Sequence, residues 1–139
     1  MRARPVRVPE AEMDVLVVLR RLGPLPVADL VRALARTRPM SHGSAGTLLS
    51  RLEAKGLVTR RKGAVGKAFV FSATERAEGA LRRAVDHVLT RVFGGDRRVM
   101  VASLLETEPL DQDEVARLER MVSDLVAARR KRRKPEVAR

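Results

Sequence analysis

The sequence predicts a mainly α-helical protein in which one short β-hairpin separates two groups of helices. Three observations support this fold class. Apolar residues recur at steps of three and four before Gly56 and again after Ser72, which is the spacing of helix faces that pack on a core. Between these stretches Phe69 and Phe71 stand two apart, as on one face of a strand. This order is typical of a winged helix-turn-helix domain followed by a helical region.

Two helices are expected before residue 40. The first spans Glu10 to Leu22, and its apolar face is wider than a surface helix needs, which indicates burial on more than one side. The second spans about Val27 to Ala35 and turns three aliphatic residues inward. Pro39 prevents this helix from continuing, so a turn must follow.

The third predicted helix lies within Ser41 to Gly56 and occupies the place of a recognition helix in the major groove. Its buried stripe consists of Ala45, Leu48, Leu49 and Leu52. The opposite face carries Ser44, Thr47 and Arg51, which could reach base edges or phosphates. We also assign Ser41 and His42 to the DNA-binding surface, with a solvated turn as the alternative for the histidine.

Two glycines, Gly43 and Gly46, stand at the front of this helix, where each costs about 1 kcal/mol relative to alanine if it is helical. One interpretation is that they permit close approach to the sugar-phosphate chain. The other is that Gly43 precedes a helix capped by Ser44.

The predicted hairpin joins strands at 57–62 and 67–72 and would form the wing. Four of its cations would lie beside the phosphate backbone, or the tip would enter the minor groove. They are Arg60, Arg61, Lys62 and Lys67. An ordinary solvated strand face is the alternative that we favour less.

Three helices are expected after the hairpin. A capping-box pattern at 72–75 opens the first, the Phe93-Gly94-Gly95 run ends it, a short helix spans Asp96 to Glu106, and a second capping pattern at 111–114 opens the last. Their apolar stripes are predicted to form the dimer contact, because so few residues cannot easily bury them within one chain. The residues are Leu81, Val85, Val88, Leu89, Val92, Leu104, Leu105, Val115, Leu118, Val122 and Leu125. For the stripe from Leu81 to Val92, a core within one chain is the alternative.

A homodimer would also supply a second recognition helix, about 34–36 Å away on the same face of the duplex. The predicted organisation is therefore a DNA-binding domain at 1–72, a dimerisation region at 73–128 and a basic disordered tail at 129–139. The tail would add non-specific DNA affinity.

Charge and composition favour double-stranded DNA as the partner. The net charge is +12, and the chain without residues 129–139 keeps 22 basic and 16 acidic residues, a net charge of +6. A body that stays cationic without its tail favours a polyanionic partner. With three phenylalanines and no other aromatic residue, the chain is poorly equipped to stack unpaired bases.

Composition also argues against other classes of function. The absence of cysteine excludes disulfides, thiolate metal sites and cysteine nucleophiles, and two distant histidines give little basis for a metal, so no cofactor is expected. No stretch resembles a signal peptide or a membrane span, which predicts a cytoplasmic protein. The helical carboxylates, such as Glu53, Glu106 and Glu114, have no partnered nucleophile or base, so an enzyme is not expected.

The chain resembles the penicillinase-repressor (BlaI/MecI) family in four stretches: EMDVLVVLRRL from Glu12, TLLSRLEAKGLV from Thr47, GKAFVF from Gly66, and the Phe93-Gly94-Gly95 break. The resemblance covers roughly residues 10–125. It implies a dimeric repressor of resistance or stress genes with an N-terminal winged helix and a C-terminal dimerisation region. The family commonly has tyrosines where this chain has Phe69 and Phe71.

Other departures concern the inducing signal. Family members that are switched by a sensor protease are cut between Asn and Phe, whereas the corresponding pair here is Ser103-Leu104, so the resemblance does not establish induction by cleavage. The copper-responsive branch carries cysteines that this chain lacks.

Two alternatives remain open at this stage. One is a MarR-like regulator with a small ligand between its DNA-binding and dimer helices, although residues 1–9 are too few for the extra N-terminal helix that it expects. The other is a non-specific nucleoid protein, which would not prefer one site by the ~10³-fold or more of a specific repressor.

Overall fold

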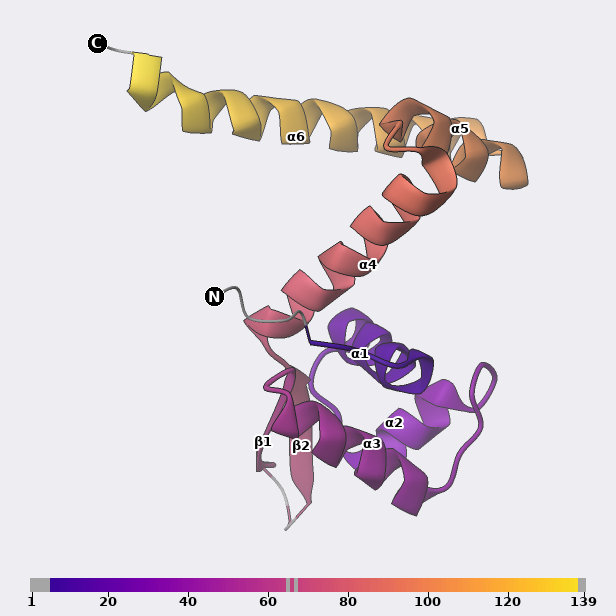
Figure 1. The fold of residues 1–139 in the computed structure, drawn as a ribbon, viewed down its shortest axis with the longest axis vertical. Coiled ribbons are helices and arrows are strands. Elements are labelled where there is room, and N and C mark those ends of the chain that lie inside the picture. Colours follow the sequence, from indigo (N-terminus) through magenta and orange to yellow (C-terminus); the bar gives the residue numbers. More distant parts are fainter. Residues whose placement is uncertain (1–5, 65, 67, 138–139) are drawn as a thin grey trace. The chain divides into compact units, whose positions relative to one another are not determined.

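The computed structural model describes residues 6–64, 66 and 68–137, with side chains as far as residue 133. The chain divides into two compact units, Met1–Val88 and Leu89–Arg139 (Figure 1). The elements in chain order are α1 (Glu10–Leu22), α2 (Val27–Leu34), α3 (His42–Ala54), β1 (Val58–Lys62), β2 (Phe69–Ala73), α4 (Glu75–Phe93), α5 (Arg97–Thr107) and α6 (Gln112–Val137). This order confirms the predicted mainly helical, winged helix-turn-helix fold class.

Unit 1 is built on one apolar core between α1, α2, α3 and the hairpin. Leu16, Leu30, Leu49 and Leu52 are fully buried there, and burying each such side chain contributes roughly 1.5–3 kcal/mol. Because these leucines come from three helices, the core fixes α3 against α1 and α2. The exposed face of α3 is therefore held at a defined angle.

The N-terminus of α3 is capped by Ser41, not by Ser44 as one sequence interpretation had it. The Ser41 hydroxyl oxygen accepts a hydrogen bond from the Ser44 backbone N–H at 3.0 Å. A serine in extended conformation before the first turn satisfies one of the free N–H groups of the helix. Gly43 consequently lies inside the helix.

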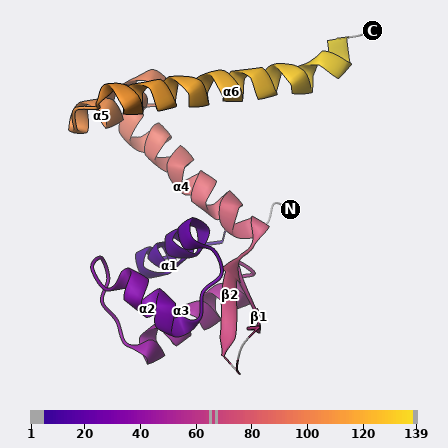
Figure 2. The ribbon, with the colours of Figure 1, turned by 180° about the vertical axis from the view of Figure 1, so that it is seen from behind.

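Strands β1 and β2 form an antiparallel hairpin in which Arg60 lies opposite Phe71 and Lys62 opposite Phe69 (Figure 2). Leu25, in the loop between α1 and α2, adds a bridge to it. The Leu25 N–H donates to the Phe71 carbonyl at 3.0 Å, and the Phe71 N–H donates to the Leu25 carbonyl at 2.9 Å. The hairpin is thus tied to the helical core at Phe71, which is itself buried.

The start of α4 belongs to the core of unit 1. Ala77, Ala80 and Leu81 are buried in this core, which moves the boundary from the predicted residue 72 to Val88. The predicted capping box at 72–75 is wrong, because Ser72 belongs to β2 and α4 begins only at Glu75. The Thr74 hydroxyl, just before the helix, donates to the Gly56 carbonyl at 2.7 Å. Leu81, predicted to contact a second copy, is therefore buried within its own chain.

Unit 2 begins within α4 and continues through α5 and α6. Gly94 and Gly95 have positive φ angles of 58° and 83°, which explains why α4 stops at Phe93. Asp96 caps α5 by accepting from the Arg98 N–H at 3.0 Å. The predicted capping box of α6 is present, because Asp111 accepts from the Glu114 N–H at 2.8 Å and Glu114 accepts from the Asp111 N–H at 3.3 Å.

Helix α6 is longer than predicted. The sequence analysis ended the helical region at residue 128, whereas α6 continues to Val137, so the prediction of a disordered segment from Arg129 onwards was wrong as far as Val137. Alanine, arginine and lysine are strong helix formers, and cations in the last turns interact favourably with the negative end of the helix dipole. The basic cluster therefore lies on a helix.

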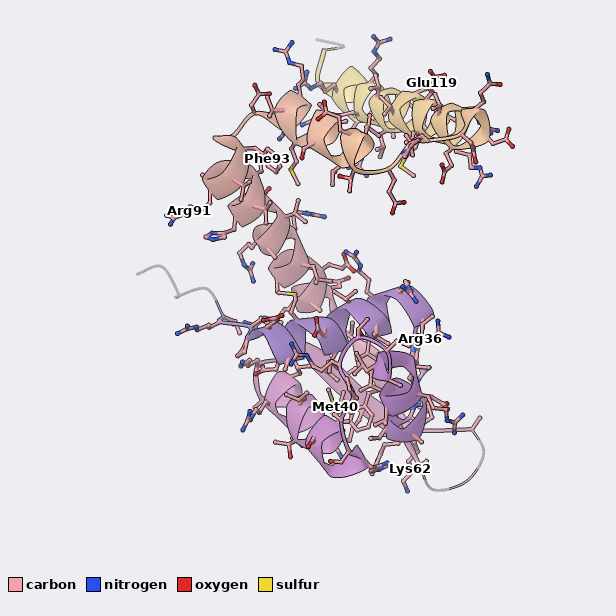
Figure 3. The ribbon with its side chains drawn as sticks, turned by 90° about the vertical axis from the view of Figure 1, so that its right-hand side faces the viewer. Arg36, Met40, Lys62, Arg91, Phe93 and Glu119 are labelled. Carbon is pink, nitrogen blue, oxygen red and sulfur yellow. The ribbon has the colours of Figure 1, made fainter. Side chains whose placement is uncertain are left out.

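Unit 2 has no core of its own in the described part of the chain. None of residues 89–133 is buried, and side chains project all around α6, Glu119 among them (Figure 3). The large exposed apolar residues of this unit are Val92, Val99, Val101, Leu104, Leu105, Val115, Leu118, Met121, Val122, Leu125 and Val126. Among the described residues, none of the helices qualifies as a membrane-spanning segment.

Candidate nucleic-acid interface

An open groove of about 800 Å³ lies between α3 and the hairpin in unit 1. One wall is the exposed face of α3, and its residues are small or polar: Gly43, Gly46, Thr47, Ser50, Arg51 and Ala54. The other wall comes from the hairpin and includes Arg60, Phe69 and Phe71. Recognition helix and wing therefore face the same concave surface.

The hydroxyl groups at the start of α3 are already engaged within the helix. Ser41 Oγ donates to Ser44 Oγ at 3.0 Å, and Thr47 Oγ1 donates to the Gly43 carbonyl at 3.1 Å. The Thr47 oxygen keeps its acceptor capacity, so it can accept from a base N–H group, and its methyl group can contact a thymine methyl. These residues are exposed, as is His42, which lines the groove.

Arg51 is exposed, lines the groove and takes part in none of the salt bridges of the described residues. Its guanidinium is therefore available to a partner. Ser50 lines the groove beside it and was missed by the sequence analysis, which followed a single three-and-four step along the helix. A broader definition of the exposed helix face, with the positions that flank this step included, would have predicted Ser50 as well.

Neither glycine of the recognition helix is required by packing within the chain. A Cβ atom added at Gly46 would meet nothing within 4 Å, and one at Gly43 would meet only the Ser41 hydroxyl at 3.9 Å. Both lie inside α3 at negative φ, where glycine weakens a helix. The alternative in which Gly43 precedes the cap is excluded, because Ser41 is the cap, and the missing side chains leave room for close approach of an outside partner.

The cations of the wing are placed differently from one another. Arg61 and Lys62 are exposed on β1, with Lys62 at its end (Figure 3). Neither takes part in a salt bridge among the described residues. The predicted contact at Lys67 lies outside the described residues.

Arg60 differs from its neighbours because the protein itself engages its guanidinium. Arg60 Nε donates to Glu53 at 2.9 Å and 3.0 Å, and Nη2 donates to the same carboxylate. The guanidinium also lies over the rings of Phe69 and Phe71, 5.2 Å and 5.0 Å from their centroids. The hydrogen bonds from Arg60 hold the pKa of Glu53 below its ordinary value, and the Glu53 carboxylate raises the pKa of Arg60.

Three further ion pairs connect the two ends of the α3 segment to α1. Lys55, at the end of α3, donates from Nζ to Glu12 at 2.5 Å and to the Arg7 carbonyl at 2.8 Å. Glu12 is the one buried charged residue among the described side chains. Arg38, before α3, contacts Asp14 at 2.5 Å and Glu10 at 3.5 Å, and its pKa is raised chiefly by the hydrogen bond to Asp14. The sequence analysis missed these three pairs, because their partners are far apart along the chain.

A family model described as penicillinase repressor matches residues 8–124, which is most of the chain. The chain belongs to the penicillinase repressor family. The match covers the groove, the wing and the exposed apolar helices, so it extends over both units. This confirms the resemblance noted in the sequence. As a member of the penicillinase repressor family, the chain is a winged-helix transcriptional regulator.

A penicillinase repressor from Staphylococcus aureus is 21% identical over 125 residues, which cover 90% of this chain and 98% of that protein. Among solved structures, the regulator Tm0710 from Thermotoga maritima has a TM-score of 0.54 at 17% identity, covering 90% of this chain and 78% of its own. A cysteine-to-serine mutant of MarR from E. coli, complexed with operator DNA, has a TM-score of 0.51 at 24% identity, covering 87% and 77%. At these identities the structural likeness concerns the fold alone.

Proposed function

We propose that this member of the penicillinase repressor family acts as a homodimer that represses transcription by binding a palindromic operator in double-stranded DNA. The observation that carries the proposal is the groove in which the exposed face of α3 and the wing converge. Recognition helices of this fold lie in the major groove, and a wing beside them reaches the adjacent backbone.

Arg51 is the residue that we assign to direct base readout. An exposed arginine on a recognition helix presents a fork that matches the two major-groove acceptors of guanine. Thr47 and Ser44 are placed on the same helix for polar or methyl contacts. Arg61 and Lys62 on the wing are assigned to phosphates, because their charges are not offset by a carboxylate in the described structure.

The apolar surface of unit 2 supports the homodimer. In α6, Val115, Leu118, Val122 and Leu125 recur at steps of three and four and form one stripe. The side chains of Val122 and Leu125 are 61% and 65% exposed, and such contact of apolar surface with water is unfavourable in free energy. A second copy can cover this stripe, because a two-fold dimer places the same patch of both protomers against each other.

Further candidate dimer residues lie on α4 and α5 and are also exposed or half-buried. They are Val85, Val88, Leu89, Val92, Leu104 and Leu105. Leu81 is omitted from this proposed interface, because it lies in the core of unit 1. Two copies joined in this way would present two recognition helices to successive turns of the duplex.

Replacement of Arg51 by alanine is expected to lower the affinity of the dimer for the cognate site by about 30-fold to 10⁴-fold, because each protomer loses one bidentate base contact of about 1–3 kcal/mol. Affinity for random duplex should fall much less, because the dimer loses only two of its many cations. Cognate duplexes are obtained by selection with the purified protein from a random-sequence pool, and both affinities are measured by fluorescence anisotropy.

Truncation after Ala128 is the complementary test, because it removes the basic end of α6, whose described side chains, Arg129 to Arg133, are all exposed. The truncated protein is expected to lose more affinity for random duplex than for the cognate site, and its affinity should depend less steeply on salt concentration. Equal losses on cognate and random duplex in both variants would contradict the separate roles of α3 and α6. If the unmodified protein selected no sequence, a non-specific nucleoid protein would be the better description.

Substitution of Gly46 by alanine should change stability and binding in opposite directions. The helix gains about 0.8–1 kcal/mol, because alanine is the better helix former and its Cβ meets no atom of the chain. Operator affinity should fall, because the added methyl group holds the DNA strand away from α3. Urea denaturation and anisotropy report the two effects, and an undiminished affinity would leave Gly46 without a role at the interface.

A further inference from the structure

The Glu53–Arg60 pair joins the two walls of the groove. Glu53 belongs to the last turn of α3, and Arg60 to the middle of β1. The carboxylate accepts from both Nε and Nη2 of the guanidinium, which is the bidentate geometry that fixes orientation as well as distance. No other ion pair among the described residues joins α3 to the hairpin.

The two phenylalanine rings complete this cluster. Phe69 and Phe71 stand two residues apart on β2 and pair with Lys62 and Arg60 on β1. Residues two apart on a strand share a face, so both rings lie on the face of the hairpin that carries Arg60. The guanidinium lies over both rings at 5.0–5.2 Å from their centroids. The Glu53 carboxylate thus offsets the charge of the Arg60 guanidinium, and the two aromatic rings pack against the same guanidinium.

This arrangement is unfavourable for a phosphate ligand. A phosphate that took the place of Glu53 on Arg60 would come close to the displaced carboxylate, and two anions would then share one cation. Arg61, the next residue, has no such carboxylate in the described structure and carries its charge freely. Two adjacent arginines of the wing therefore differ in chemistry.

We propose that Arg60 is a positioning residue that, with Glu53, clamps the wing to the recognition helix and so sets the width of the groove that receives DNA. The inference rests on the proposed function and assigns a role within the same site. The wing cations that contact phosphate are then Arg61 and Lys62, and Arg60 acts through the geometry of the groove walls.

The substitution Glu53→Gln separates the two roles of Arg60 by the sign of its effect. If Arg60 binds phosphate, removal of the competing carboxylate raises affinity for cognate and random duplex alike. If Arg60 is the clamp, the loss of one charged hydrogen bond loosens the wing, and the preference for cognate over random duplex falls about tenfold. The variant changes no residue assigned to DNA.

Arg60→Lys is the second variant, because it keeps the charge but loses the planar fork and the stacking on the rings. If Arg60 is the clamp, Arg60→Lys should lower the preference for cognate over random duplex about tenfold and leave the salt slope unchanged. The double variant Glu53→Gln with Arg60→Lys should show no larger loss of preference than either single variant, because both substitutions break the same pair. Arg61→Gln is the matched control, which should flatten the salt slope of the dimer by about 1.8, because each protomer loses one phosphate contact worth about 0.9.

A measurement on the wing itself guards against misfolded variants. The Arg60 Nε–H resonance in an NMR spectrum of the unmodified full-length protein should be protected from solvent exchange, and it should keep its shift when cognate duplex is added. Displacement of that resonance by DNA, a rise in affinity for cognate and random duplex alike with Glu53→Gln, or a flattened salt slope in a third variant, Arg60→Gln, which removes the charge of Arg60, would each overturn the clamp alone. Failure of the unmodified protein to select any sequence would overturn the proposed function and the clamp with it.

Discussion

Replacement of both Val122 and Leu125 by glutamate is expected to yield a monomer that binds its operator about 10²–10⁴-fold more weakly than the unmodified protein, the gain that linkage of two sites typically provides. The two side chains are among the most exposed apolar groups of α6. Carboxylates at these positions would have to be desolvated and placed against one another in the dimer, which opposes association strongly.

Analytical ultracentrifugation gives the oligomeric state, and anisotropy with full and half operators gives the affinity. The matched control places two glutamates at Ala116 and Ala127, which are exposed on the opposite side of α6 and add the same charge. The control should remain dimeric and lose only the small affinity that the added charge costs. A glutamate variant of Val122 and Leu125 that remained a tight-binding dimer would place the dimer contact elsewhere.

The second large effect is expected from Lys55→Met, which should lower the free energy of unfolding of unit 1 by about 3 kcal/mol, the lower end of the range for breaking a buried ion pair. Glu12 is 2% exposed, and Lys55 supplies its only salt bridge in the described structure. The variant leaves a buried carboxylate without its cation. The lower end applies because the Lys55 side chain is itself 28% exposed.

Urea denaturation followed by circular dichroism measures this loss. The double variant Glu12→Met with Lys55→Met removes both charges, so it should recover most of the stability, because replacing a buried pair by apolar groups is often neutral. If the double variant were as unstable as the single one, the cost would come from lost packing and not from the unpaired carboxylate.

Much of this protein follows from local sequence. The spacing of Leu49 and Leu52, the glycines at 94 and 95, and the capping box at Asp111 each act through residues a few positions apart, so the predicted helices and the hairpin agree closely with the structure. The family resemblance was available for the same reason, because its motifs are short runs. The exposure of Thr47 and Arg51 followed from the buried stripe on the other face of α3.

Only the tertiary structure decided how individual side chains are used. Arg60 and Arg61 are equivalent in sequence, yet Arg60 faces Glu53 and two phenylalanine rings while Arg61 takes part in no salt bridge of the described structure, because neighbouring residues of a strand point to opposite faces. Leu81 shares its stripe with the predicted dimer residues, yet it is buried in the core of unit 1. The physical reason is common to both cases: periodicity specifies which face of an element is apolar or charged, whereas the partner of that face depends on chain segments that fold back from distant positions.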